Sequence, residues 1–395
     1  MLNMLCENTT SKLLGMEDVI VKKVWEEWDR RHIEVEQPRR MHICPACGRE
    51  TDTIHDYREQ RVRDIPSYGK YTVLHLRKRR YRCRHCGKRF PEENAFLPRY
   101  HQTTTRLVAK VIDDFRELRP AKQIATENGV SVTTAFRYFG LVSYRCGMLP
   151  EVLSIDEFKG NAGGERFQGI LTDPKHQRIL DILPNRKSED LLAYFSKFST
   201  RNSVKVVVMD MNKAYLEVVR TCFPKATVVI DKYHVVRQAI WAFENVRKTE
   251  QRKFSDERRR YFKRSRSLLT KHPSKLKEEE ADAVSVMLMA SERLRQAYHL
   301  KNKFQEFMWS KSSAEGKKRL AEWILLSELA ALPEFKACLT AVHNWDKYIL
   351  NAFDYPYTNG FTEGCNNKIK VLKRVCFGVR NFSRFRNRIL HCAAA

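Results

Sequence analysis

Hydrophobic residues follow two different periods along this chain, and the change between the periods marks its regions. Short β-rich apolar runs occur at 60–65 and 71–76 and recur between 152 and 231, where Gly, Pro or Asp residues separate them. This arrangement is typical of strands. Segments 105–144 and 241–348 instead repeat apolar residues every three or four positions, which indicates helices. The pattern predicts a multidomain α/β (α+β) chain.

Strands and helices follow a defined order after residue 149. We expect strands at 152–158, 167–173 and 178–183, a helix at 189–198, a strand at 204–210, a helix at 212–220, and a strand at 227–231 that leads into a helix containing His234. This is the order of the ribonuclease-H-like fold, in which the first and fourth strands are neighbours. We therefore expect Asp156 and Asp210, at the ends of those two strands, to lie side by side.

Three short helices are predicted upstream of these strands. Their ranges are 105–118, 121–128 and 132–139, with a turn at Gly129 and a capping residue at Ser131. Helices of this length around a Gly-containing turn form a helix-turn-helix, and its last helix enters the major groove of DNA. We expect four side chains to face the groove: Thr133, Thr134, Arg137 and Tyr138. A helical hairpin used only for packing is the alternative.

One late amphipathic helix, residues 358–374, carries a single acid. Its apolar stripe consists of Phe361, Cys365, Ile369, Leu372 and Cys376, and the other face carries Glu363, Asn367, Lys370 and Arg374. After Glu363 the chain has eight Lys or Arg residues and no acid. An ordinary amphipathic helix with one Glu is the simplest interpretation. The functional interpretation is a metal ligand, Glu363, beside a bound polyanion. In that interpretation we expect Asn367, Lys370 and Arg374 to contact the DNA backbone.

Four of the 11 cysteines have the spacing of metal ligands. Cys44 and Cys47 precede Gly48, and Cys83 and Cys86 precede Gly87. Two such Cys-x-x-Cys turns, each relaxed by a glycine, can present four thiolates to one tetrahedral zinc ion. We therefore predict a zinc ribbon with one structural Zn²⁺.

The chain carries a formal net charge of +26, which favours a polyanionic partner. Between Arg77 and Arg89, eight of thirteen residues are Lys or Arg. We expect Arg77, Lys78, Arg79 and Arg80 to contact DNA phosphates. No long apolar run points to a membrane, and charged residues interrupt the first apolar stretch, so we expect a cytoplasmic protein without a signal peptide.

These patterns divide the chain into six expected segments. They are an N-terminal helical segment at 1–38, the zinc ribbon at 39–100, the helix-turn-helix domain at 101–148, the first part of a ribonuclease-H-like core at 149–240, an all-helical insertion at 241–350, and the last part of the core at 351–395. Within the first segment we expect an irregular start and then a short helix, with apolar positions at Val19, Val21, Val24, Trp25 and Trp28.

The three acids Asp156, Asp210 and Glu363 can converge if the predicted strand order is correct. Neighbouring carboxylates repel one another unless hard cations are bound, and oxygen ligands favour Mg²⁺ or Mn²⁺. Two such ions could activate a water or a 3′-hydroxyl for phosphoryl transfer. Glu157 is the alternative to Asp156, although its side chain should point to the opposite face of the sheet.

The motifs together resemble a DDE transposase of bacterial insertion sequences, in particular the ISL-three family. The resemblance rests on the two cysteine turns, on residues 104–144, and on three acidic motifs: Ser-Ile-Asp156-Glu-Phe, Val-Met-Asp210-Met-x-x-x-Tyr, and Asn359-Gly-x-x-Glu363-Gly-x-Asn366-Asn367-x-Ile-Lys. Asp231-Lys-Tyr-His234 is similar to an Asp-x-x-His element of several transposase superfamilies.

The resemblance implies an enzyme with Asp156, Asp210 and Glu363 as ligands of two Mg²⁺ or Mn²⁺ ions, and with His234 at the scissile phosphate or supporting the site. It implies double-stranded DNA partners, namely terminal inverted repeats and target DNA. It also implies a homodimer or larger synaptic complex in a bacterial nucleoid, and a tail slightly longer than the one after Arg388. A transposase-derived DNA-binding regulator without catalysis is the alternative, and a structure-specific nuclease is a third interpretation.

Overall fold

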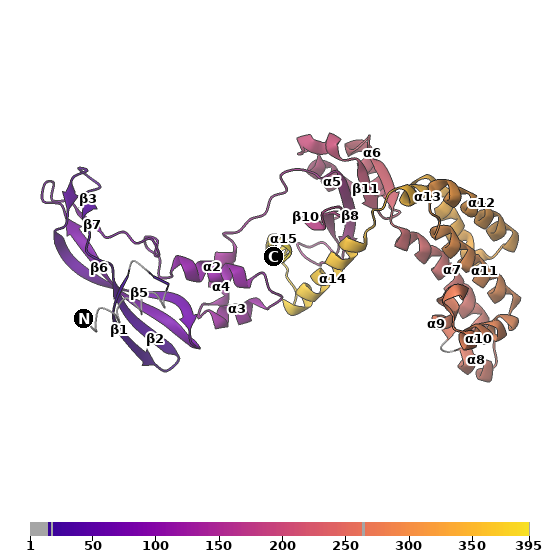
Figure 1. Ribbon diagram of the computed structural model, residues 1–395, viewed down its shortest axis with the longest axis horizontal. Helices are drawn as coiled ribbons and strands as arrows, with labels where there is room; N and C mark the ends of the chain where they lie inside the picture. Colours follow the sequence, from indigo (N-terminus) through magenta and orange to yellow (C-terminus); the bar gives the residue numbers. More distant parts are fainter. Residues whose placement is uncertain (1–14, 17–18, 263–264, 395) are drawn as a thin grey trace. The chain divides into compact units, whose positions relative to one another are not determined.

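The computed structural model describes residues 15–16, 19–262 and 265–394, so the expected irregular start at 1–14 lies outside it. The chain forms two compact units (Figure 1). The first unit comprises Met1–Tyr144, Val371–Gly378 and Asn387–Ala395, and the second comprises Arg145–Lys370 and Val379–Arg386. The mixed α/β class expected from the sequence is confirmed.

A twisted sheet dominates the first unit. Its strands are β1 (Ile20–Glu27), β2 (Arg30–Glu36), β5 (Ile54–Ser67), β6 (Lys70–Arg82) and β7 (Arg89–Pro91), and their order is β1-β2-β6-β5 with β7 paired to β6. The small hairpin of β3 (His42–Ile43) and β4 (Glu50–Thr51) stands apart. Apolar side chains from the larger sheet, such as Val35, Leu74 and Leu76, are almost completely buried.

The helix expected within residues 1–38 is wrong. Residues 20–36 form a hairpin instead, in which Val21 is buried and Val24 is exposed. The apolar spacing of this segment fits a strand as well as a helix, and pairing of β2 with the distant β6 favours the strand. Trp28 occupies the hairpin turn with a φ of 53°.

The three helices of the predicted helix-turn-helix are confirmed as α2 (Thr105–Asp114), α3 (Ala121–Glu127) and α4 (Val132–Phe139). The first is shorter than expected. Ser131 caps α4 by accepting a 3.1 Å hydrogen bond from the backbone N–H of Thr134. Gly129 has a φ of +63°, and the Tyr71 ring lies where a side chain at this position would begin. Only glycine fits such a turn without strain.

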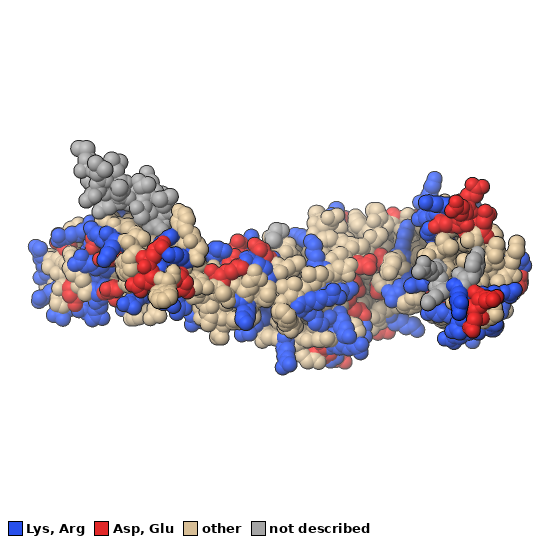
Figure 2. Space-filling view, turned by 90° about the horizontal axis from the view of Figure 1, so that it is seen from below, with Lys and Arg blue, Asp and Glu red and all other residues tan. Residues whose placement is uncertain are grey.

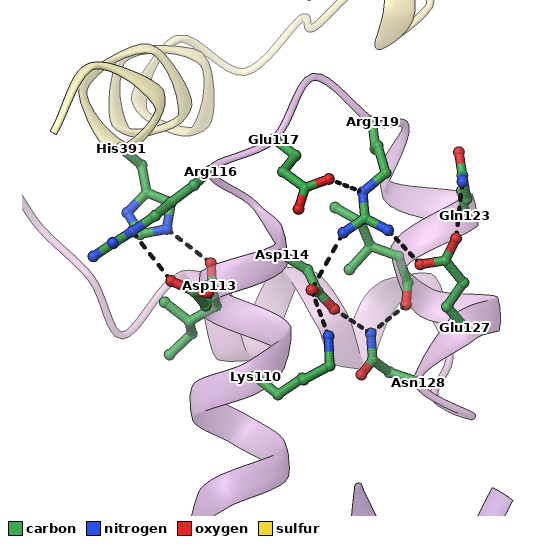
Figure 3. Close-up of polar contacts among 12 residues, drawn as sticks. Lys110, Asp113, Asp114, Arg116, Glu117, Arg119, Gln123, Glu127, Asn128 and His391 are labelled. Atoms are coloured by element: carbon green, nitrogen blue, oxygen red, sulfur yellow. Dashed lines mark hydrogen bonds and ion pairs between the residues drawn. The ribbon is translucent and has the colours of Figure 1, made fainter. Parts of the chain in front are cut away.

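Residues from the far end of the chain close this helical group. The last helix, α15 (Phe382–Ala393), brings Arg388 to the carbonyl oxygens of Glu117 and Arg119, at 2.7 and 2.8 Å. His391 donates through Nε2 to the carbonyl of Ile112 at 2.7 Å. Figure 3 shows His391 beside the polar network at the end of α2, where Asp114 accepts hydrogen bonds from several side chains. Carbonyl oxygens at and after the end of α2 thereby gain side-chain partners.

The second unit is built on a five-stranded sheet. Its strands are β8 (Val152–Phe158), β9 (Gln168–Asp173), β10 (Arg178–Leu183), β11 (Val206–Met209) and β12 (Thr227–Ile230), in the order β10-β9-β8-β11-β12. Strands β8, β11 and β12 run parallel, whereas β9 and β10 are antiparallel. The predicted neighbourhood of the first and fourth strands is confirmed. Helices α5 (Ser188–Phe195) and α6 (Lys213–Cys222) lie near the sheet (Figure 1).

Helices fill the predicted insertion. They are α7 (Lys232–Arg252), α8 (Asp256–Phe262), α9 (Ser265–Thr270), α10 (Glu278–Met289), α11 (Glu292–Met308), α12 (Ser313–Ala330) and α13 (Lys336–Asp354), with short 3-10 turns at Pro273–Lys275 and Pro333–Phe335. A further 3-10 turn, Ser199–Ser203, precedes β11. Trp323 and Phe304 meet edge to face in the core of this bundle. Asn351 of α13 donates to the Val228 carbonyl of β12, so the bundle is fastened to the sheet.

The late amphipathic helix is α14 (Gly360–Val375). Its expected apolar stripe is confirmed at its centre, where Cys365, Ile369 and Leu372 are buried. None of the helices in the described ranges is long and apolar enough to cross a membrane.

Candidate active site

Asp156 and Asp210 lie on neighbouring parallel strands. Met209 pairs with Ile155, so the two aspartates follow at the same edge of the sheet. Burial, and then the charge of Asp210, raises the pKa of Asp156 to about 7. The structure therefore brings together two of the three predicted acids. Their negative charges repel each other, so a bound cation would stabilise the ionised form of both carboxylates.

His234 joins this pair from the first turn of α7. Its Nδ1 lies 2.9 Å from Asp210 Oδ1 and 3.2 Å from Asp231 Oδ2. Hydrogen bonds to Asp210 and then to Asp231 raise the pKa of His234 to about 10. The imidazole is therefore a cation at neutral pH, held between two carboxylates.

Asn359, which precedes α14, connects three parts of the site. Its backbone N–H donates to Asp231 at 3.0 Å, and its side-chain amide donates to Asp210 at 3.4 Å. Its side-chain oxygen accepts a 2.7 Å hydrogen bond from Ser154 of β8. The chain entering α14 is thus fixed against both strands that carry the aspartates.

Two further α14 residues face strands β8 and β9. Asn366 donates a 2.9 Å hydrogen bond to Asp156 Oδ2, and the fully buried Thr362 contacts the hydroxyls of Ser154 and Thr172 at 3.0 and 2.7 Å. The resemblance included Asn359 and Asn366 without giving them roles. Their spacing of four and three residues around Glu363 was the signal, since such positions share one helical face.

Glu363 lies exposed in the first turn of α14, and its backbone N–H donates to the Asn359 carbonyl at 2.8 Å. In the sequence, Glu363 lies between Asn359 and Asn366, which donate hydrogen bonds to Asp210 and Asp156. In the described ranges, however, the four cysteines are the one group of three or more His, Cys, Asp or Glu side chains whose ligand atoms lie within 4.8 Å of one another. Convergence of Glu363 with the aspartates stays a prediction.

Glu157 faces away from the aspartates. Its carboxylate accepts hydrogen bonds from Tyr215 and Arg186, in agreement with the opposite-face orientation expected for it. Asp156 is therefore the better ligand candidate of the two.

The four predicted zinc ligands meet in the first unit. The sulfur atoms of Cys44, Cys47, Cys83 and Cys86 all lie within 4.8 Å of one another. The two cysteine turns have the same geometry. Gly48 and Gly87 have φ values of 70° and 71°, and the backbone N–H of each donates a 3.0 Å hydrogen bond to the carbonyl oxygen of the first cysteine in its turn. Four thiolates at this separation suit a closed tetrahedral zinc site.

The basic run of β6 is only partly available to DNA. Arg77 is exposed and stacks over Tyr57 at 4.0 Å, and Lys78 is half-buried. Arg79 as a DNA contact is wrong: it is 5% exposed, lies 3.2 Å from Glu92 and donates to the Gln37 carbonyl at 2.6 Å. Four successive strand residues cannot all face one side, so some of the run turns inward.

Arg80 is paired within the protein as well. Its guanidinium forms a bidentate ion pair with the Asp56 carboxylate on the adjacent strand β5. Direct phosphate contact by Arg80 would need this pair to open. Arg77 lies 3.7 Å from Glu36, a longer ion pair, and its side chain is more exposed than that of Arg80, so Arg77 is the better candidate of the two.

Helix α4 presents three of its four predicted side chains. Thr133 and Arg137 are exposed, and Thr134 is half-buried. Tyr138 as a groove-facing residue is wrong, because it is 7% exposed and its hydroxyl donates to Thr103 Oγ1 at 2.9 Å. It shares the inner face of α4 with Ala135 and Phe139.

The basic face of α14 is exposed as expected. Asn367, Lys370 and Arg374 all lie at the surface, and Lys370 donates to the Asn367 side chain at 3.1 Å. Figure 2 shows groups of Lys and Arg side chains spread among uncharged residues, with some Asp and Glu between them. DNA contact by these three residues stays a prediction.

Comparisons with known proteins agree with this architecture. A family profile described as "Transposase", of the ISL3 group of DDE transposases, matches residues 153–389, more than half of the chain. A second profile, described as the zinc-finger of transposase IS204/IS1001/IS1096/IS1165, matches residues 40–86. The helix-turn-helix lies between the two matched ranges.

Curated relatives give the same picture. The chain is 27% identical over 395 residues to the transposase for insertion sequence element IS1001 of Bordetella parapertussis, with 97% of each chain covered. It is 24% identical over 244 residues to the transposase for IS1557 of Mycobacterium tuberculosis, with 55% of this chain and 54% of the relative covered. A third relative, named ATP-dependent protease in Lactococcus lactis, is 33% identical over 131 residues, about a third of either chain. The chain belongs to the ISL3 family of DDE transposases, enzymes that cleave DNA and transfer its strands.

Proposed function

We propose that this transposase binds the terminal inverted repeats of an insertion sequence, cleaves DNA at those ends and joins them to target DNA at a site with two divalent cations. Asp156, Asp210 and Glu363 would hold the cations. The observation that carries the proposal is the pair of hydrogen bonds from Asn359 and Asn366 to the two aspartates, because these residues lie four positions before and three positions after Glu363.

The residues present fit divalent cations. Asp156 is buried beside Asp210, and its pKa of about 7 leaves it only partly ionised at neutral pH. A bound cation would favour the ionised carboxylate. The side-chain oxygen of Asn366 is also buried and has no hydrogen-bond partner among the described residues. It adds an oxygen of the type that Mg²⁺ and Mn²⁺ prefer. When bound, such ions activate a water or a 3′-hydroxyl and stabilise the leaving oxygen.

The protein's own groups would orient this chemistry. His234, a cation between Asp210 and Asp231, offers positive charge to the scissile phosphate. Asn366 fixes the orientation of the Asp156 carboxyl, and Asn359 fixes that of Asp210. These contacts reduce the reorganisation that the site needs when DNA arrives.

DNA reading belongs to the first unit in this proposal. Thr133, Thr134 and Arg137 would contact base edges from α4, and Arg77 and Lys78 would contact phosphates. Two ends must be held at once, so we expect a dimer or larger synaptic complex. The basic face of α14 would contact the DNA backbone beside the cleaved phosphate.

The test uses labelled end DNA with the purified full chain and Mg²⁺ or Mn²⁺. We expect nicking or joining by the wild-type protein, and loss of strand chemistry with retained end binding for Asp210→Ala. Glu151→Gln is a matched control, since Glu151 precedes β8 at its opposite end and pairs with Lys175 and Lys205. If Asp210→Ala cuts as well as the wild type, the assignment is wrong. If the wild type binds ends but cuts with neither metal, the result would favour the alternative, a DNA-binding regulator without catalysis.

A further inference from the structure

A row of side chains on helix α7 starts beside the candidate active site and follows the helix away from it. Tyr233, Arg237 and Trp241 follow one another at intervals of four residues, so they share one face of the helix. Together with Arg266, Ser267 and Thr270 of α9, and with Val236 and Ile240, they line a groove of about 680 Å³. This volume lies within the range of pockets that hold nucleotide-sized ligands, about 300–1,000 Å³.

The groove has the chemical character of a stacking site. Tyr233 and Trp241 are 55% and 49% exposed, which is high for large aromatic side chains. The guanidinium of Arg237 lies 4.1 Å from the centre of the Trp241 ring. Among the described residues that line the groove there are two arginines and no acid, and one of the two, Arg266, also lies 3.2 Å from the buried Glu244 of α7. Flat aromatic faces beside cations suit an aromatic ligand that carries negative charge.

The groove begins next to the catalytic residues. The Tyr233 ring meets the His234 ring edge to face, with centroids 5.6 Å apart and an interplanar angle of 85°. His234 in turn contacts Asp210 at 2.9 Å. A ligand in the groove is therefore only two side chains away from the carboxylate proposed to hold a metal ion.

We infer that this groove binds an unpaired stretch of a DNA strand, with a base stacked on Trp241 and its phosphates beside Arg237 and Arg266. Bases in a duplex are stacked on one another and do not present their faces, so the partner of these aromatic side chains is single-stranded. The groove would hold a strand unpaired next to the cleaved phosphate. That role at the catalytic site rests on the proposed function, whereas the binding of unpaired DNA does not.

The test measures fluorescence anisotropy of a labelled oligothymidylate with the full-length protein, without added Mg²⁺ or Mn²⁺. An excess of unlabelled random-sequence duplex occupies non-specific phosphate sites. We expect Trp241→Ala to weaken binding about tenfold, as is usual for the loss of one stacked base, and Trp241→Phe to keep most of it.

Trp309→Ala is the matched control. Trp309 is 48% exposed in the same helical bundle and has Lys275 5.9 Å from its ring, but it does not line the groove. We expect this variant to bind oligothymidylate like the wild type. Equal binding by Trp241→Ala and the wild type would overturn the inference, and so would equal losses in the two alanine variants.

A strand of abasic residues separates stacking from phosphate attraction. We expect the wild type to bind it about tenfold more weakly than oligothymidylate, with no further loss in Trp241→Ala. Equal affinity of the wild type for both strands would overturn stacking. Duplex end binding and end cleavage are measured in parallel. Failure of the wild type to cleave ends would overturn the proposed function and leave the single-strand result standing.

Discussion

Asn366 donates a 2.9 Å hydrogen bond to Asp156 although 210 residues separate the two in sequence. The donor comes from α14 and the acceptor from β8, so the bond fixes the helix of Glu363 against the strand of the first aspartate. The Asn366 amide makes this contact without adding charge to an already crowded pair of acids.

We expect Asn366→Ala to lower the rate of end cleavage by about ten- to a hundredfold, because the Asp156 carboxyl loses the contact that orients it. End binding, measured by gel shift, should not change, since the residue lies in the second unit. Asn245→Ala, an exposed position on α7, is the control and should cleave normally. Normal cleavage by Asn366→Ala would show that the contact is dispensable.

We expect DNA binding to require zinc. We expect zinc binding to depend on the four clustered cysteines and not on the other cysteines of the chain. We expect Cys83→Ser to lose the metal, measured by mass spectrometry of the purified protein, and to lose most end binding, because the two cysteine turns no longer share a centre. Cys146→Ser lies outside the cluster and should keep one zinc ion per chain. A Cys83→Ser protein that retains stoichiometric zinc would contradict the four-cysteine assignment.

The turn at Gly129 offers a stability test with an internal reference. A Cβ at Gly129 would lie 2.7 Å from the Tyr71 ring, whereas a Cβ at Gly69 meets no atom within 4 Å, and both residues have positive φ values. Gly69→Ala should therefore show only the backbone cost of about 1–2 kcal/mol. We expect Gly129→Ala to lose more, as a lower denaturation midpoint of the first unit. Equal midpoints for the two variants would mean that the ring moves aside freely.

Lys301 should make stability depend on pH. The side chain is fully buried in α11, and burial lowers its pKa to about 7. Its Nζ donates to the Lys271 carbonyl at 2.7 Å. An unfolded lysine has a pKa near 10.4, so between about pH 7 and pH 10 the unfolded chain binds more protons than the folded one. Stability contributed through Lys301 therefore rises with pH in this window.

Lys301→Met should flatten that rise and increase stability at pH 7, where a charged group no longer has to be buried. Urea denaturation at pH 7 and pH 9 measures both effects. Lys303→Met is the control on the same helix: Lys303 pairs with Glu306 and Glu322 at the surface, so this variant should keep the wild-type pH dependence. A Lys301→Met protein with that same dependence would count against the buried, low-pKa amine.

The sequence predicts the sheet of the second unit because its central strands carry continuous apolar runs, as strands buried on both faces do. The runs at 206–209 and 227–230 are buried and flanked by turns, so their type and order follow from the pattern alone. The α4 cap at Ser131 and the cysteine turns are also local signals.

The predictions that the structure contradicts share a physical cause. In each case the residue or segment contacts a partner that is far away in the sequence. Arg79 is buried because Glu92 and Glu36 lie next to it, and Tyr138 is buried because Thr103 accepts its hydroxyl. The β1–β2 hairpin depends on pairing with β6. Local periodicity contains none of these contacts. The roles of Asn359 and Asn366 were missed for the same reason, although their helical spacing around Glu363 was visible.

The contacts of Arg388 and His391 with α2 and the turn after it set an order of events during synthesis. The helix-turn-helix leaves the ribosome early, but Arg388 and His391 follow only after the strands and helices of the second unit have been translated. A nascent chain, or one that stops within its catalytic half, therefore carries an unfinished DNA-reading module. If the chain binds transposon ends as proposed, such fragments should compete poorly with the full-length protein for those ends.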